Sequence, residues 1–185
     1  RKGRGSSEQY HGAIVGHDNS DQTRIFKEVS EVGKALSQLS AVTGSAAESK
    51  IALLYDWDNY WILNEAQFGH NSGDKKYIET VLNHYAAWKQ IGFNVDMIDQ
   101  TGDLSPYSIV CGPMQYLLKN GFAKRVQAFV EKGGTYIGTY ISGWVNEENL
   151  AFLGGYPGPL SQVLGIWDEE TDALDEKGQN HFTWQ

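Results

Sequence analysis

The segment Ile51–Trp61 constrains the fold more than any other part of this chain. Its first residues, Ile51–Tyr55, form a continuous apolar run of the kind found in parallel strands that are covered on both faces. The residues that follow, Asp56–Trp61, include two carboxylates and cannot continue a buried strand. We therefore expect the chain to turn to the surface at the carboxyl end of this strand, the edge at which open α/β sheets bind ligands and partners.

Strands and helices are expected to alternate after this segment. Hydrophobic periodicity predicts helices over residues 74–91 and 114–131, and short apolar runs predict strands at Phe93–Ile98, Tyr107–Cys111 and Thr135–Ile141. Right-handed crossovers between parallel strands place helices on both faces of a sheet. The pattern therefore predicts a three-layer, flavodoxin-like α/β fold.

A polar segment divides the chain in two. From Ile25 to Leu39, apolar residues recur at spacings of three and four, which predicts an amphipathic helix after N-cap candidates at Asp18–Asp21. Residues 40–50 are small and polar and are interpreted as a linker. We therefore predict one domain over residues 1–47 and a second over residues 48–185.

Charge and composition narrow the possible partners. The net charge of −8 argues against a nucleic acid or an anionic membrane, because both bind basic surfaces. No apolar run approaches the roughly 20 residues that cross a bilayer, and the first residues do not resemble a signal peptide. A single cysteine, Cys111, excludes an internal disulfide and fits a cytoplasmic protein, which is the expected location.

Cys111 is the candidate nucleophile of the sequence. Class I glutamine amidotransferases, which share the three-layer fold, carry their cysteine on a sharp turn between strand and helix with flanking glycines. Here the glycine two residues before the cysteine is missing, and Pro113 removes a backbone N–H near the place where an oxyanion would be bound. A buried structural thiol is therefore the favoured interpretation, and an amidotransferase-like domain remains the alternative.

Neither a cofactor nor a metal is expected. No glycine-rich phosphate loop follows the strand at Ile51–Tyr55, and the five histidines match no ligand spacing. Asp56 and Asp58 are two residues apart on a segment that we expect to be extended, and they could form a catalytic pair. The favoured interpretation is that one of them caps a turn while the other is solvated.

Trp57, Tyr60 and Trp61 place three large rings at the expected sheet edge. Burying one such ring removes on the order of 150–250 Å² from water, so we do not expect all three to remain solvated. They are predicted to form an interface with another chain or domain, and a sugar-binding surface is the alternative.

Several ordered strings resemble the later part of the β-galactosidases of glycoside hydrolase family 42. The resemblance rests on YHGAIV at residues 10–15, TR at 23–24, ALLYDWDNYW at 52–61, GPMQYLL at 112–118, GGT at 133–135 and FLGGYPGPL at 152–160. Together these strings extend over essentially the whole chain.

The resemblance implies an enzyme that hydrolyses terminal non-reducing β-D-galactosides with retention of configuration. In that family, a TIM barrel with two catalytic glutamates precedes a flavodoxin-like domain that builds a homotrimer, and a small β domain follows. Residues 1–47 would supply the last strand and last helix of the barrel, the helix at about Thr23–Leu39, and residues 48–185 would be the trimerisation domain. The catalytic glutamates would lie outside this chain, which is expected to be inactive alone.

The resemblance also implies two substrate-binding residues. In the family, a Glu-x-x-His pair just after the last barrel strand contacts the hydroxyls of galactose, and Glu8 and His11 match that pattern. An ionised carboxylate accepts hydrogen bonds from two hydroxyls, and an imidazole adds a directional bond. The pair would then lie on the face at which TIM barrels bind their substrates.

Overall fold

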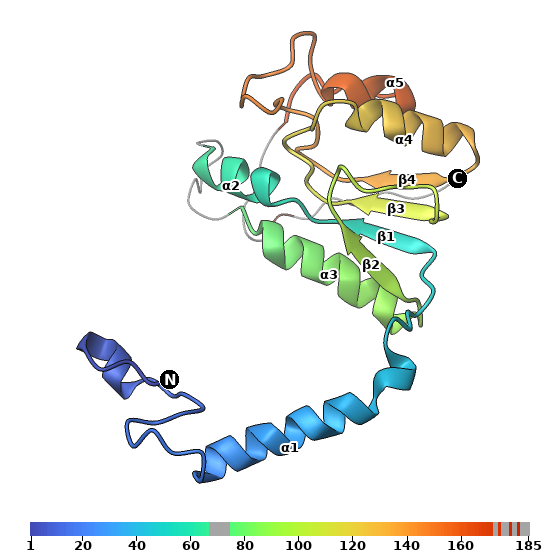
Figure 1. The fold of residues 1–185 in the computed structure, drawn as a ribbon. Helices are drawn as coiled ribbons and strands as arrows, with labels where there is room; N and C mark the ends of the chain where they lie inside the picture. The colour runs from blue at the N-terminus through green and yellow to red at the C-terminus, as the bar shows by residue number, and fades with distance from the viewer. Residues whose placement is uncertain (67–74, 172–173, 175–177, 179–180, 182–185) are drawn as a thin grey trace. The chain divides into compact units, whose positions relative to one another are not determined.

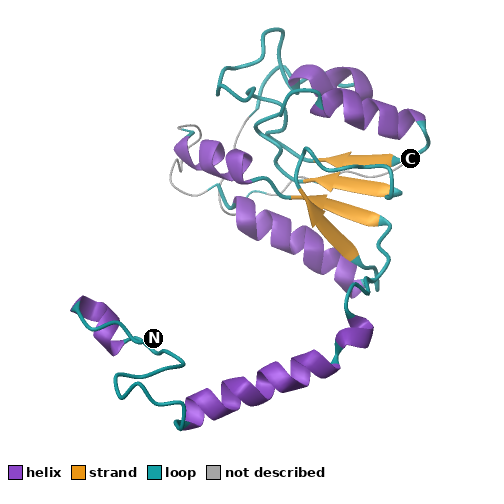
Figure 2. Cartoon of the chain, viewed as in Figure 1, coloured by secondary structure: helices purple, strands orange, loops and turns teal. Residues whose placement is uncertain are grey.

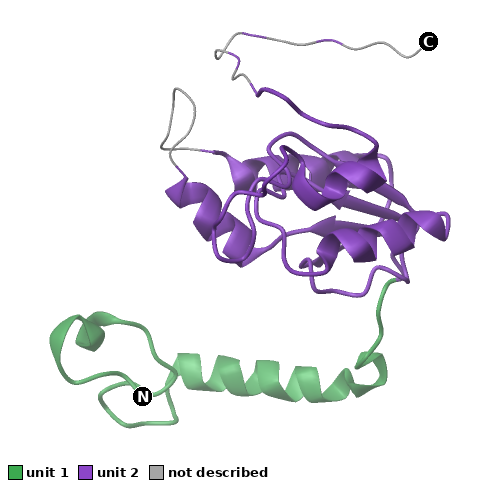
Figure 3. Cartoon of the chain, turned by 90° about the horizontal axis from the view of Figure 1, so that it is seen from above, with its two compact units in different colours: residues 1–47 green, residues 48–185 purple. Residues whose placement is uncertain are grey.

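The computed structural model of the chain describes residues 1–66, 75–171, 174, 178 and 181. The chain divides into two compact units, Arg1–Ala47 and Glu48–Gln185 (Figure 3). Within the described residues, no helix combines the length and the apolar character that crossing a membrane requires.

The first unit is helical and irregular. It contains the helix α1 (Arg24–Gln38) and the 3-10 helices η1 (Ser6–Tyr10) and η2 (Ser40–Val42). Helix α1 is capped by Thr23, whose hydroxyl accepts a hydrogen bond from the N–H of Phe26 at 3.2 Å, and not by a residue of Asp18–Asp21. The barrel strand implied by the resemblance is not formed, because no backbone of residues 1–47 joins a ladder with a neighbouring strand.

The second unit is built on a parallel four-stranded sheet (Figures 1 and 2). The strands are β1 (Ile51–Leu54), β2 (Val95–Ile98), β3 (Ile109–Gly112) and β4 (Thr135–Gly138). Their order across the sheet is β2-β1-β3-β4, and Ile51 of β1 lies opposite Val95 on one side and Ile109 on the other. The predicted parallel sheet is therefore confirmed, with strands shorter than the apolar runs.

Helices cover both faces of this sheet (Figure 1). Helix α3 (Tyr77–Gln90) lies on one face and α4 (Phe122–Glu131) on the other. Helix α2 (Trp57–Glu65) lies beyond the carboxyl ends of the strands, and α5 (Ser161–Leu164), which follows the 3-10 helix η3 (Gly158–Leu160), packs against α4. Side chains of a strand alternate between faces, so Leu53 packs with Tyr77 of α3 while Leu54 packs with Phe122 of α4. Two hydrophobic cores result, one on each face, and the predicted three-layer α/β fold is confirmed.

The expected helix over residues 114–131 begins only at Phe122. Residues before it form a buried loop whose backbone is bound by the side chain of Asn59. The Nδ2 of Asn59 donates to the carbonyl of Met114 at 3.0 Å, and its Oδ1 accepts from the N–H of Leu117 at 2.8 Å. A distant side chain therefore replaces the helical hydrogen bonds that periodicity predicted for this loop.

The expected helix over residues 74–91 is found as α3, although residue 74 lies outside the described residues. Its buried side chains are Tyr77 and Val81, whereas the neighbouring apolar residues Ile78 and Leu82 are exposed. Only a narrow stripe of this helix therefore faces the sheet.

Candidate functional site

The carboxyl end of β1 leads directly into a capped helix. Asp56 has an extended backbone, and its Oδ1 accepts hydrogen bonds from the N–H groups of Asp58 at 3.0 Å and Asn59 at 3.4 Å. This is the arrangement of an N-cap, and it starts α2 at Trp57. The expectation of an extended segment here is wrong, because the cap satisfies the first N–H groups of a helix.

The carboxylates of Asp56 and Asp58 share one cation. The Nζ of Lys119 lies 2.8 Å from Oδ2 of Asp56 and 2.8 Å from Oδ2 of Asp58. Burial lowers the pKa of Lys119, but hydrogen bonds and charge attraction from the two carboxylates outweigh it, so the pKa is raised above its ordinary value. The two carboxylates and Lys119 form a structural clamp. Asp56 caps a helix where the favoured interpretation expected a capped turn, and Asp58, which was expected to be solvated, is half-exposed and ion-paired with Lys119.

A buried polar network continues from Lys119 into the loop before α4. Gln100 is fully buried; its Oε1 accepts from the N–H of Lys119 at 2.9 Å, and its Nε2 donates to Gln115 at 3.0 Å and to the carbonyl of Leu117 at 2.7 Å. Gln115 is also buried and donates to the carbonyl of Pro113 at 2.8 Å. Satisfied buried amides of this kind select one loop conformation.

Helix α2 presents its indole rings at the surface. Trp57 and Trp61 are each 57% exposed, with ring centroids 6.0 Å apart, whereas Tyr60 is half-buried between them and the core. Two further rings support this surface: Tyr55 meets Trp57 edge-on at 5.1 Å and stacks on Tyr77 at 5.4 Å. We call Trp57, Tyr60 and Trp61 the aromatic surface.

The sequence did not identify the polar residues that hold the aromatic surface in place. Lys119, Asn59, Gln100 and Gln115 were not identified as site residues, although each holds the sheet edge together. The one local signal was the presence of amide side chains within apolar strings, as in DWDNYW and GPMQYLL. Such residues are expected to be hydrogen-bonded when buried, but their partners cannot be read from the string itself.

Cys111 lies in the core at the end of β3. Its side chain is 1% exposed, and burial raises its pKa to about 11, an effect that the indole N–H of Trp88 partly offsets. A thiol of this kind is protonated at neutral pH and is closed to substrates, whereas a nucleophilic cysteine needs a lowered pKa and access. The favoured interpretation as a structural thiol agrees with this environment.

We expect Cys111 to make folding stability fall at alkaline pH. An ordinary thiol in the unfolded chain loses its proton near pH 8.5, whereas the folded thiol keeps it to about pH 11. The unfolded state therefore binds fewer protons in this window, and the free energy of unfolding decreases as pH rises through it. Urea unfolding across this pH range should show a shallower decline for Cys111→Ala.

Tyrosines whose raised pKa does not depend on Cys111, such as Tyr55 and Tyr77, lower the stability of both proteins equally above about pH 10. The difference between the two curves, clearest below that pH, therefore reports the thiol. Parallel curves for wild type and Cys111→Ala would contradict the assignment. Alkylation of Cys111 in the folded protein is also expected to be slow until urea is added.

Glu8 and His11 lie together in the first unit. The Nδ1 of His11 is 3.4 Å from Oε2 of Glu8, and both side chains are about two-thirds exposed. The backbone N–H of His11 also donates to the carbonyl of Glu8 at 3.2 Å, which ends η1. The short 3-10 helix thus places the carboxylate and the imidazole side by side in solvent.

Within the described part of the chain, no three His, Cys, Asp or Glu residues are grouped as metal ligands. Of the two histidines of the first unit, His11 pairs with Glu8, and the Nε2 of His17 lies 2.7 Å from the carbonyl oxygen of Gly3.

Comparisons with known proteins match the whole chain. A family model described as a β-galactosidase trimerisation domain matches residues 49–185, and one described as β-galactosidase matches residues 1–39. The β-galactosidase Pbg of Clostridium perfringens is 46% identical over 99% of this chain, and GanA of Bacillus subtilis is 42% identical over all of it. The chain spans about a quarter of the length of these relatives, 26% and 27%.

Solved structures agree with this match. The β-galactosidase of Bacillus circulans sp. alkalophilus superposes with a TM-score of 0.79 at 42% identity, covering 97% of this chain and 26% of that one. The enzyme of Rahnella sp. R3 gives a TM-score of 0.76 at 45% identity, over 96% of this chain and 26% of that one. The chain therefore belongs to the β-galactosidases of glycoside hydrolase family 42, and most of it is their trimerisation domain.

Proposed function

We propose that this chain is part of a retaining β-galactosidase that hydrolyses terminal non-reducing β-D-galactosides. The observation that carries the proposal is the match to proteins named β-galactosidase over 99% of the chain at 46% identity. Retaining hydrolysis needs two carboxylates about 5–5.5 Å apart across the sugar. Asp56 and Asp58 are bound by Lys119 and are not assigned this role. As the resemblance to the family implies, we assign the catalytic glutamates to residues outside this chain.

The two units have different roles in this proposal. Residues 1–47 form the end of a TIM-barrel catalytic domain, and residues 48–185 form a flavodoxin-like domain for homotrimer assembly in the cytoplasm. Helix α1 supports the first assignment, because most of its apolar face is exposed, namely Ile25, Val29, Val32, Leu36 and the C-cap residue Leu39. A helix that covers a barrel presents such a face to the barrel.

The aromatic surface supports the second assignment. Trp57 and Trp61 remain more than half exposed, while their backbone is fixed by the cap of α2 and by the Lys119 ion pairs. Exposed aromatic residues on a rigid element are typical of protein interfaces. We therefore assign this surface to contacts between subunits, and the sugar-binding alternative predicts stacking of galactose on the same rings.

The function is tested with the protein that contains this chain and a nitrophenyl β-galactoside. We expect the longer protein to release nitrophenol and residues 1–185 alone to release none, because both catalytic carboxylates are assigned elsewhere. Turnover by the isolated chain would overturn the division of roles. Inactivity of the longer protein on every β-galactoside tried would overturn the proposed activity.

Glu8 and His11 are proposed to bind galactose. Glu8→Ala in the active protein is expected to lower kcat/KM by roughly 10- to 100-fold, because a hydrogen bond to a charged group contributes about 1.5–3 kcal/mol. His11→Ala should cost less, since it removes a single directional hydrogen bond. Steady-state kinetics on a nitrophenyl galactoside measure both.

The matched control is Ser7→Ala, an exposed neighbour on the same 3-10 helix. It should leave kcat/KM unchanged. If Glu8→Ala behaved like Ser7→Ala, the sugar-binding role of Glu8 would be excluded, whatever the fold of the first unit.

A further inference from the structure

The dipeptide Asn120-Gly121 is the single Asn-Gly sequence in the chain, and it lies immediately before α4. Asn120 is exposed, and its side-chain amide has no hydrogen-bond partner among the described residues. The backbone N–H of Gly121 likewise has no acceptor within the described part of the chain. An unengaged amide side chain is therefore followed directly by an unengaged backbone nitrogen.

We infer that Asn120 is a site of spontaneous deamidation, a modification that lies beyond the proposed hydrolase function. The backbone nitrogen of Gly121 gives its proton to a solvent base and attacks Cγ of Asn120. A C–N bond closes a succinimide ring, and the side-chain nitrogen leaves as ammonia. Water then opens the ring at either carbonyl and leaves isoaspartate or aspartate, with no oxidation or reduction.

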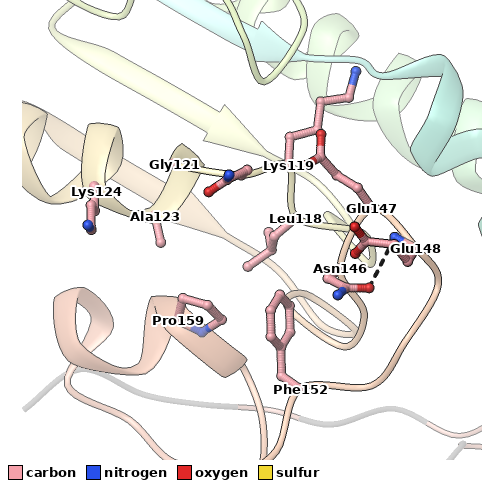
Figure 4. A pocket seen from close by; sticks show the side chains of 11 residues that line it. Leu118, Lys119, Gly121, Ala123, Lys124, Asn146, Glu147, Glu148, Phe152 and Pro159 are labelled. Atoms are coloured by element: carbon pink, nitrogen blue, oxygen red, sulfur yellow. Dashed lines mark hydrogen bonds between the residues drawn. The ribbon is translucent and has the colours of Figure 1, made fainter.

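The surroundings of this dipeptide admit the reaction. Asn120 and Gly121 line an open cavity of about 450 Å³ together with Lys119 and Lys124 (Figure 4), so water and base reach the reacting atoms. Gly121 has no side chain to obstruct ring closure, and its φ of 76° is a conformation that glycine adopts freely.

The consequences follow from what holds the two flanking residues. The N–H of Lys119 donates to Gln100 at 2.9 Å, and the N–H of Phe122 donates to the carbonyl of Lys119 at 3.0 Å. Phe122 is fully buried in the core. Isoaspartate adds a methylene group to the main chain between these anchors, so we expect the start of α4 and the Lys119 ion pairs to be strained.

Ageing the purified protein in mildly alkaline buffer tests the inference. Peptide mapping by mass spectrometry, with fragmentation that separates isoaspartate from aspartate, should find conversion at Asn120 severalfold faster than at Asn149. Asn149 is a suitable internal reference, because it is also exposed but is followed by the bulky Leu150. An Asn120 that keeps its amide for as long as Asn149 does would overturn the inference.

The variant Asn120→Gln separates the modification from its consequence. The longer side chain closes a ring more slowly, and Asn120 has no partner among the described residues for the substitution to remove. Ageing should lower the melting temperature of the wild type and leave that of Asn120→Gln nearly unchanged. An equal decline in both proteins would show that the modified residue does not strain α4.

Discussion

Replacing Lys119 with methionine is expected to destabilise the second unit by about 3–5 kcal/mol, the usual cost of removing one partner from a buried ion pair. The side chain of Asp56 is fully buried, and that of Lys119 is only 16% exposed. Methionine keeps an unbranched stem but removes the cation, so Asp56 retains two N–H donors and loses its counter-charge. Within the described residues, Oδ2 of Asp56 has no other hydrogen-bond donor. Urea unfolding at neutral pH measures the loss.

Two variants make this prediction specific. Asp58→Asn removes the other carboxylate, whose side chain is 53% exposed, and it should cost less than about 1 kcal/mol, as exposed pairs do. Asp56→Asn combined with Lys119→Met removes both buried charges and keeps a good N-cap. The double variant should therefore be more stable than the sum of the two single losses implies. If Lys119→Met lowered the free energy of unfolding by no more than Asp58→Asn does, the proposed role of Lys119 as the buried counter-charge of Asp56 would be wrong.

The same residues explain how far the sequence predicted this structure. The sheet was predictable because its strands are local apolar runs, and Ile51–Leu54 is buried on both faces as such a run requires. Helix α2 was not predictable from the sequence, because its start depends on the cap at Asp56. Its apolar and polar residues also follow no helical period. Local patterns therefore identified the layers of the fold but not the helix that carries the aromatic surface.

The loop before α4 was mispredicted for a related reason. Its residues have helical periodicity, yet the side chains of Asn59 and Gln100 bind its backbone in another conformation. These partners come from elements far apart in sequence, and a single sequence does not show which residues meet. For Glu8 and His11, the motif alone indicated the pair, and the structure adds that the two side chains are adjacent and exposed.

The second large effect is expected at the aromatic surface. Trp57→Ala combined with Trp61→Ala should dissociate the proposed homotrimer, because truncating a central interface tryptophan commonly costs about 2–4 kcal/mol and two such losses act together. The fold should survive, since both rings are more than half exposed and the cap at Asp56 is untouched. Sedimentation equilibrium on the longer protein that contains this chain measures the assembly.

Trp167→Ala is the matched control for this double variant. Trp167 is 63% exposed in the same unit, and it lies apart from α2 in sequence and is bound through its indole N–H to the carbonyl of Gly154 at 3.2 Å. If α2 carries the subunit contact, Trp167→Ala should keep the trimer mass at concentrations where the double variant is monomeric. Equal dissociation by both would remove the special role of α2, and an intact trimer in the double variant would place the interface elsewhere. If the longer protein that contains this chain is a monomer, galactose-dependent quenching of Trp57 and Trp61 fluorescence would instead favour the sugar-binding alternative. In a monomer, both rings would be free to stack on the sugar.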